Sequence, residues 1–258
     1  MTDRTPHILI TNDDGITSPG LLSLKDALAE VGHITVLAPN HNWSASGHVK
    51  TMHKPLRVEA VTLLDGTPAL TTDGAPSDAV ALAFLGIIED PIDMVVSGVN
   101  RGANLGHDVT YSGTVTAAME GVIAGVPAIA VSLNSPTSED FSVAGGFAAR
   151  LARRVLERGL PSGVLLNVNV PPIPAEQIAG VLVTRMGLRI YRDELVRRLD
   201  PRGRPYYWIG GPAPTGVEEE GTDIWAIAHG YISVTPIQLD LTAYRFLDTL
   251  GEWELDGD

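Results

Sequence analysis

Two adjacent aspartates follow the first apolar run of the chain, and their type and position suit the binding of a divalent cation. Asp13 and Asp14 stand side by side, and adjacent carboxylates repel each other unless a positive charge lies between them. Together with the hydroxyl of Ser44 and the amide of Asn100 they would form an all-oxygen ligand set, which suits Mg²⁺ or Mn²⁺ better than zinc. A second interpretation stays open, because Asn-Asp-Asp-Gly is also a good turn sequence whose aspartates can cap the next helix.

A loop rich in glycine and asparagine, Gly98–Gly106, precedes a Ser-Gly-Thr helix start, and this combination suits an anion. Glycines let backbone N–H groups approach an anion, and a helix N-terminus adds donors and the positive end of the helix dipole. A plain helix N-cap remains the alternative interpretation of Ser-Gly-Thr. We expect phosphate to be bound by the side chains or backbone groups of Asn100, Asn104, Ser112, Gly113 and Thr114.

Composition limits the classes of partner. The formal net charge of -13 opposes binding to duplex nucleic acid, whereas a bound cation can still make one pocket attractive to a small phosphate. The longest apolar stretch, Gly121 to Leu133, is broken by glycine and proline and is too short to span a membrane. The chain has no cysteine and no start typical of a secretion signal, and we therefore expect a cytoplasmic protein.

Strand and helix patterns alternate through the first two thirds of the chain, which predicts an α/β fold. The strand candidates are continuous apolar runs, as expected for parallel strands covered on both faces. They are His7–Thr11, Ile34–Ala38, Asp93–Ser97, Ala128–Leu133 and Val164–Val168. The helix candidates lie between them, at Ser18–Val31, from Pro76 to about Leu85, at Ser112–Ile123 and at Phe141–Leu156. We predict a doubly wound, mostly parallel sheet of Rossmann-like type, in which the polar clusters after the strands share one crevice.

The pattern changes after about Arg185. Residues 189–204 are rich in charge, Pro205–Ile209 is aromatic and strand-like, and a loop rich in proline, glycine and glutamate follows. This segment has too little apolar periodicity for a core of its own, so we expect a hairpin or arm that packs on a second subunit. We predict a catalytic core over residues 1–185 and an arm with a closing strand (Trp225–Pro236) and helix (Thr242–Leu250) over residues 186–258. Both would belong to one domain.

Five motifs in order resemble the survival protein SurE family of 5'/3'-nucleotidases, and the likeness runs from Ile8 to about Leu247. The motifs are Ile10–Gly15 (ITNDDG), Ser44–Gly47 (SASG), Ser97–Gly102 (SGVNRG), Asp108–Gly121 (DVTYSGTVTAAMEG) and Gly230–Pro236 (GYISVTP). The resemblance implies one divalent metal per subunit, held by Asp13, Asp14, Ser44 and Asn100. It also implies hydrolysis of nucleoside 5'- and 3'-monophosphates, with short polyphosphate as a further substrate of some members, and a homodimer or homotetramer formed through the C-terminal arm.

We expect a metal-activated water to attack phosphorus in line, with Asp13 and Asp14 as the catalytic pair that holds the ion and accepts the proton. Three other classes remain to be weighed. An aspartyl-phosphate phosphatase would need a second aspartate where Gly15 stands. A non-catalytic, metal-dependent nucleotide sensor would bind nucleotide without releasing phosphate. A nicotinamide dehydrogenase is poorly supported, since no Gly-x-Gly-x-x-Gly follows the first strand.

Overall fold

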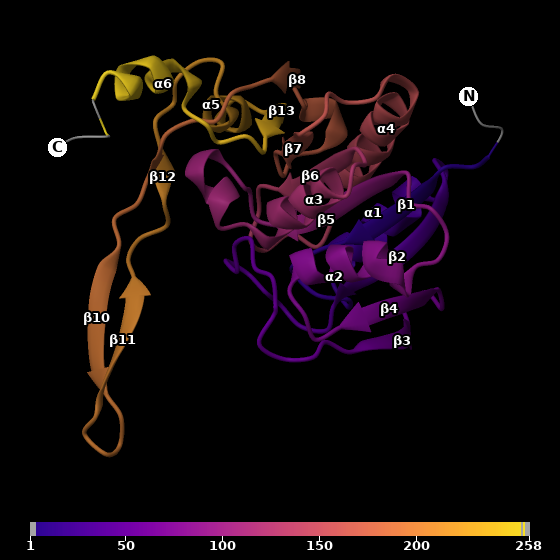
Figure 1. The fold of residues 1–258 in the computed structure, drawn as a ribbon, viewed down its shortest axis with the longest axis horizontal. Helices are drawn as coiled ribbons and strands as arrows, with labels where there is room; N and C mark the ends of the chain where they lie inside the picture. The colour runs from indigo at the N-terminus through magenta and orange to yellow at the C-terminus, as the bar shows by residue number, and fades with distance from the viewer. Residues whose placement is uncertain (1–3, 254, 256–258) are drawn as a thin grey trace.

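A nine-stranded, mostly parallel sheet forms the centre of the protein in the computed structural model, which describes residues 4–253 and 255 (Figure 1). From one edge to the other the strands are β3 (Val58–Thr62), β4 (Pro68–Thr72), β2 (His33–Pro39), β1 (His7–Thr11), β5 (Met94–Arg101), β6 (Ala128–Leu133), β7 (Val164–Val170), β13 (Tyr231–Gln238) and β8 (Gly180–Val183). The strands from β4 to β7 run parallel, whereas β3 is antiparallel to β4 and β13 is antiparallel to β7. The predicted doubly wound, mostly parallel α/β fold is therefore confirmed.

Helices cover both faces of the sheet. Helices α1 (Pro19–Leu28) and α4 (Ser142–Arg158) pack on each other and on one face, and α2 (Pro76–Leu82) and α3 (Gly113–Ile123) pack on the other. A single π-helical turn, η1 (Ala83–Ile87), extends α2, and two short 3-10 turns, η2 (Gly106–Thr110) and η3 (Ala175–Gln177), occur later. Both cores consist mainly of aliphatic side chains from the strands, which explains the continuous apolar runs in the sequence.

All five predicted strands exist, with ends that differ by a few residues. The β3–β4 hairpin and β8 were not predicted, because these strands are short and β3 and β4 mix apolar with polar residues. The predicted closing strand Trp225–Pro236 is wrong in its first part, which forms helix α5 (Asp223–Ala228). The hydroxyl of Thr222 accepts the Trp225 N–H and caps this helix, and Gly230, with a φ of 76°, separates it from β13.

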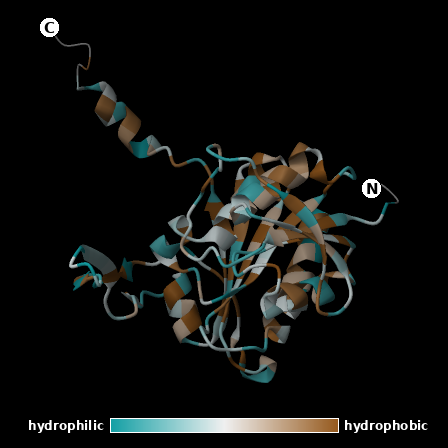
Figure 2. Ribbon diagram, turned by 90° about the horizontal axis from the view of Figure 1, so that it is seen from below, coloured by the Kyte–Doolittle hydropathy of each residue, from teal (hydrophilic) through white to brown (hydrophobic). Residues whose placement is uncertain are grey.

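The region after residue 185 contains the predicted arm. Strands β9 (Arg189–Ile190) and β12 (Thr215–Gly216) form a short stem, and β10 (Glu194–Leu199) and β11 (Pro205–Gly210) form a hairpin that extends away from the sheet (Figure 1). The terminal helix α6 (Tyr244–Gly251) matches the helix predicted at Thr242–Leu250 and also projects from the rest of the molecule (Figure 2). The chain between these two parts returns to the sheet as β13.

No helix within residues 4–253 is long and apolar enough to cross a membrane.

The start of α1 packs directly against the end of β5, the strand that carries Asn100. A Cβ atom at Gly20 would lie 2.1 Å from the carbonyl oxygen of Val99, and this backbone cannot move without shifting the strand. We expect Gly20→Ala to lower the free energy of unfolding by about 1 to 3 kcal/mol, measured by urea denaturation. Gly146→Ala in α4 is the matched control, because its nearest contact would be 3.8 Å away, and it should be neutral or stabilising. If Gly20→Ala were as stable as Gly146→Ala, the close approach of Gly20 to the Val99 carbonyl would be contradicted.

Candidate active site

A cavity of about 380 Å³ lies beside the carboxyl ends of β1 and β5, where ligands bind in open α/β sheets. Five of the predicted site residues line it, namely Asp13, Ser44, Asn100, Asn104 and Ser112. The remaining lining residues are Ala45, Arg101, Gly102, Ala103, Asp108, Tyr111, Tyr191 and Pro214. The expectation that clusters after separate strands share one crevice thus agrees with the geometry of the described chain.

Asp13 is buried at the end of β1, with only 4 % of its surface exposed. One carboxylate oxygen accepts the Thr114 hydroxyl at 2.6 Å, and the other accepts the Thr114 N–H at 3.1 Å. Gly113 permits this contact, since a Cβ there would lie 2.8 Å from the Cβ of Asp13. The N-terminus of α3 therefore packs directly on the carboxylate and fixes its orientation.

Asp14 is half-buried and is bound by the end of β5 and by the loop after β2. Its carboxylate accepts the Arg101 N–H at 3.0 Å and the Asn42 side-chain amide at 3.3 Å. The side-chain oxygen of Asn42 in turn accepts the hydroxyl of Ser44 at 2.6 Å. Asn42 thus connects Asp14 with Ser44, and the backbone N–H of Trp43 anchors the same loop on the carbonyl oxygen of Asp13 at 2.8 Å.

Burial makes the two carboxylates costly to ionise together. It raises the pKa of Asp13 from 3.8 to about 6; the hydrogen bonds from Thr114 act against this increase, and the charge of Asp14 adds to it. Burial also raises the pKa of Asp14, against the opposing effect of the Arg101 N–H and guanidinium. A cation between the carboxylates would relieve both costs.

The amide of Asn100 is oriented with its oxygen free. Its Nδ2 donates to the carbonyl oxygen of Gly102 at 2.8 Å, so Oδ1 is left for another partner. The Ser44 hydroxyl donates to the side-chain oxygen of Asn42, and the lone pairs of its own oxygen stay available to a cation. Since these two oxygens and the Asp13 carboxylate line one cavity, with Asp14 adjacent, the residues present fit a hard divalent cation.

The predicted phosphate-binding residues fall into two groups. Asn100, Asn104 and Ser112 line the cavity, and the Ser112 oxygen also caps α3 by accepting the Val115 N–H. Thr114 is fully buried and directs its donors at Asp13, and Gly113 packs against Asp13 as well. The structure therefore uses these two residues to position a carboxylate.

A buried asparagine network lies behind the cavity, and the sequence did not predict it. The carbonyl oxygen of Asn104 accepts the side-chain amides of Asn167 and Asn169 at 2.9 and 3.0 Å, and its own Nδ2 donates to the Ser132 hydroxyl at 2.8 Å. These partners come from β6 and β7, so the loop after β5 is fixed to the sheet. Asparagines within apolar strand runs were the available sequence signal.

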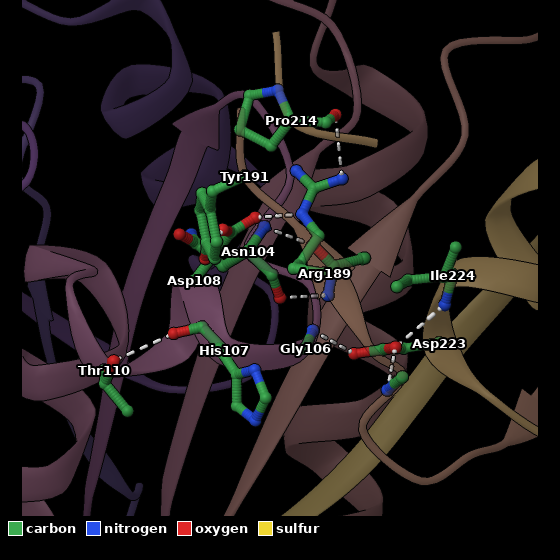
Figure 3. A network of polar contacts seen from close by, with 12 residues as sticks. Asn104, Gly106, His107, Asp108, Thr110, Arg189, Tyr191, Pro214, Asp223 and Ile224 are labelled. Carbon is green, nitrogen blue, oxygen red and sulfur yellow. Dashed lines mark hydrogen bonds and ion pairs between the residues drawn. The ribbon is translucent and has the colours of Figure 1, made fainter. Parts of the chain in front are cut away.

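A second network, also missed, joins the loop at η2 to the stem of the arm (Figure 3). Asp108 accepts Nε of Arg189 and the hydroxyl of Tyr191, both at 2.6 Å. Asp223, which is fully buried, accepts the N–H groups of Gly106 and Gly187 at 2.8 and 2.7 Å. Pairs separated by more than 80 residues, such as Asp108 and Tyr191, have no local sequence signal.

Fold and site together define a doubly wound α/β protein whose site combines two aspartates, a serine and an asparagine at the carboxyl edge of its sheet. The sequence model of a family described as survival protein SurE matches residues 8–193. Two similar curated proteins carry the name 5'-nucleotidase SurE. The one from Chloroflexus aggregans is 54 % identical over 96 % of this chain and 99 % of its own length. That from Herpetosiphon aurantiacus is 56 % identical over 95 % of this chain and 97 % of its own length.

A solved structure agrees with these sequence relationships. The SurE protein from Aquifex aeolicus superposes with a TM-score of 0.81 at 40 % identity, covering 96 % of this chain and 99 % of that one. The chain therefore belongs to the SurE family, as its motifs predicted.

The buried charge at Asp13 predicts a pH-dependent stability in the absence of metal. The pKa of Asp13 is about 6 in the folded protein and 3.8 for an unperturbed aspartate, which stands for the unfolded chain. Between these pH values the folded state binds more protons than the unfolded state. The free energy of unfolding therefore falls as the pH rises from about 4 to 6. Asp13→Asn removes the charge, and its amide can still pair with Thr114. We expect this variant in EDTA at pH 8 to be more stable than wild type by about 1 to 3 kcal/mol, measured by urea denaturation.

The advantage of Asp13→Asn should shrink at pH 4 and below. The control is Asp90→Asn, which changes an exposed aspartate and should not alter stability at either pH. A variant less stable than wild type at pH 8 would mean that the buried carboxylate stabilises the metal-free fold.

Proposed function

We propose that this protein hydrolyses nucleoside 5'-monophosphates to nucleoside and phosphate with the help of one Mg²⁺ or Mn²⁺ ion per subunit. The observation that carries the proposal is the pair Asp13 and Asp14, held by helix α3, the end of β5 and the loop after β2 beside a cavity that Ser44 and Asn100 also line. The curated relatives from Chloroflexus aggregans and Herpetosiphon aurantiacus, named as 5'-nucleotidases, support it over nearly the full chain.

Asp13, Asp14, Ser44 and Asn100 would hold the cation through oxygen atoms. A divalent cation, when bound, supplies a Lewis acid that neutralises phosphate charge and lowers the pKa of water. Asp13 is kept rigid by Thr114, so its carboxylate is pre-positioned and loses little freedom when a ligand binds. Of the two carboxylates, Asp14 is the more exposed and is the better candidate to accept a proton from the attacking water.

The substrate phosphate would be bound at the same end of the cavity. The Ser112 hydroxyl can donate to a phosphate oxygen while its own oxygen caps α3, and Arg101, which also lines the cavity, adds a positive charge nearby. The N-terminus of α3 adds its dipole. Asn100 and Asn104 complete the polar lining, which would stabilise the charge on the transferring phosphoryl group.

The finer parts of the function stay predictions. The activities on 3'-monophosphates and on short polyphosphate rest on the family resemblance, Mg²⁺ or Mn²⁺ rests on the all-oxygen ligand set, and a cytoplasmic location rests on the composition of the chain. The rival class is a metal-dependent nucleotide sensor without catalysis. One measurement separates the sensor from the nucleotidase: a sensor binds nucleotide but releases no phosphate from it.

We also propose that the arm joins subunits into a homodimer or homotetramer. The hairpin leaves large apolar side chains in solvent, with 64 % of Trp208, 83 % of Ile209 and 71 % of Leu195 exposed. An exposed apolar hairpin of this kind is typical of a surface that becomes covered by another chain.

The metal site predicts that loss of either aspartate abolishes turnover. We expect Asp13→Ala and Asp14→Ala each to lower kcat/KM for AMP by at least about 100-fold, because each removes a cation ligand and transition-state stabilisation with it. Phosphate release from AMP with Mn²⁺ or Mg²⁺ measures this effect, and excess EDTA should remove the wild-type activity. The control is Asp90→Ala, an exposed aspartate in the loop before β5, which should retain full activity.

Two results would contradict the proposal. Activity of wild type that persists in excess EDTA would exclude the metal scheme. Binding of AMP in the presence of metal, with no phosphate released from any nucleoside monophosphate, would favour the sensor.

If the arm joins subunits, the molar mass of the protein in solution should depend on the apolar side chains of the hairpin. Replacing Trp208 and Ile209 together by glutamate should lower the molar mass in light scattering from that of an oligomer to that of one chain, because charges would enter the covered surface. The control replaces Leu64 and Leu85, two exposed leucines outside the arm, by glutamate and should leave the molar mass unchanged. A wild-type protein that is already monomeric would contradict the proposed assembly.

A further inference from the structure

The lining of the active-site cavity combines two kinds of side chain. Asp13, Ser44, Asn100 and Ser112 are polar, and the cation and phosphate would bind to them. The lining also contains two aromatic side chains, Tyr111 and Tyr191, together with Pro214 from the segment before β12. The alcohol part of a phosphate ester bound by the polar groups would extend away from the metal ligands, and these three residues are available to contact it.

Both tyrosine rings are accessible to a ligand. The exposed fraction is 59 % for Tyr111 and 38 % for Tyr191. Tyr111 follows η2 directly and precedes Ser112, the N-cap of α3, so it lies next to a predicted phosphate-binding residue. Tyr191 follows β9 in the stem of the arm. Aromatic side chains beside a polar pocket suit a flat, stacking group, and each stacked base contributes appreciably to affinity.

The ring of Tyr191 is held in place by a partly buried carboxylate. Asp108 accepts the Tyr191 hydroxyl at one oxygen and Nε of Arg189 at the other, both at 2.6 Å (Figure 3). Arg189 also donates to the carbonyl oxygen of Pro214 at 3.5 Å. The side chains of Asp108 and Arg189 are only 19 % and 17 % exposed, so this ion pair is screened less than a surface pair.

Tyr191 and Asp108 direct hydrogen bonds at groups of the protein. Asp108 has accepted a bond at each oxygen, and the Tyr191 hydroxyl has donated its proton. Burial and Asp108 raise the pKa of Tyr191 to about 12, so the ring stays neutral in ordinary buffers. What Tyr191 chiefly offers a ligand is therefore its neutral aromatic ring.

We propose that Tyr191 and Tyr111 form a stacking site for the base of the substrate nucleotide, with Asp108 as the residue that positions Tyr191. The inference rests on the proposed nucleotidase function and deepens it. Such a site would let the protein prefer a nucleotide to a phosphate ester without an aromatic group. It also assigns the stem of the arm a part in substrate recognition.

The test compares two phosphate monoesters that differ in the alcohol part, AMP and glycerol 2-phosphate. The ratio of their kcat/KM values is measured for wild type, Tyr191→Leu and Tyr191→Phe. We expect Tyr191→Leu to lower the ratio roughly 10-fold, because the base loses its stacking partner. Tyr191→Phe keeps the ring and should retain more than about a third of the wild-type ratio. Tyr111→Leu should lower the ratio in the same direction.

Tyr244→Leu is the matched control. Tyr244 is an exposed tyrosine in α6 whose hydroxyl also donates to an aspartate, Asp240, and it does not line the cavity. Its replacement should leave both activities at the wild-type level. An unchanged ratio in Tyr191→Leu would overturn the proposal, and so would an equal loss on both esters. A loss in Tyr191→Phe as large as in Tyr191→Leu would also overturn it, since the hydroxyl and not the ring would then be responsible.

An equilibrium measurement separates this inference from the proposed function. If wild type hydrolyses neither ester, the proposed function fails, and calorimetric binding to the Mn²⁺-loaded protein decides the stacking site. We expect Tyr191→Leu to raise the Kd of AMP roughly 10-fold and to leave the Kd of inorganic phosphate unchanged. An AMP affinity equal to that of wild type would overturn the inference.

Discussion

The cost of burying the negative charge of Asp13 beside Asp14 is the constraint on which the rest of the site depends. A carboxylate with 4 % of its surface exposed, next to a second carboxylate, is unfavourable without positive potential nearby. The fold supplies part of that potential through the Thr114 N–H and hydroxyl and the backbone N–H of Arg101. The remainder is the reason to expect a cation at this point, and the free oxygens of Asn100 and Ser44 lie on the same cavity.

Each element around the site contributes to holding this charge. Helix α3 can approach Asp13 because Gly113 has no side chain, and the tight contact of Gly20 with Val99 sets the end of β5 against α1. The loop after β2 is tied to Asp14 through Asn42. Behind the cavity, Asn104 is fixed by Asn167 and Asn169. The site is thus rigid where charge must be stabilised, which is the property that electrostatic catalysis requires.

Local patterns allowed most of the sheet and its helices to be predicted, and they suggested the ligand set, which stays a prediction. Strands buried on both faces have continuous apolar runs, and the Ser-Gly-Thr motif after η2 marks the start of helix α3. The prediction of a closing strand was wrong at Trp225–Ala228, because an apolar run of that length fits a short helix equally well. The Thr222 side chain caps this segment as a helix. The phosphate role given to Thr114 came from the same motif, yet the motif could not show that Asp13 would take both of its donors. Contacts between distant segments, such as Asp108 with Arg189 and Tyr191, have no local pattern.

The central claim is that Asp13 and Asp14 share one cation with Ser44 and Asn100. A crystal structure of the Mn²⁺-soaked protein, with anomalous data collected above the manganese edge, tests this claim most directly. We expect one anomalous peak within coordination distance of an oxygen atom from each of these four side chains. A peak elsewhere in the cavity, or none at all with both carboxylates in the metal-free arrangement, would contradict it.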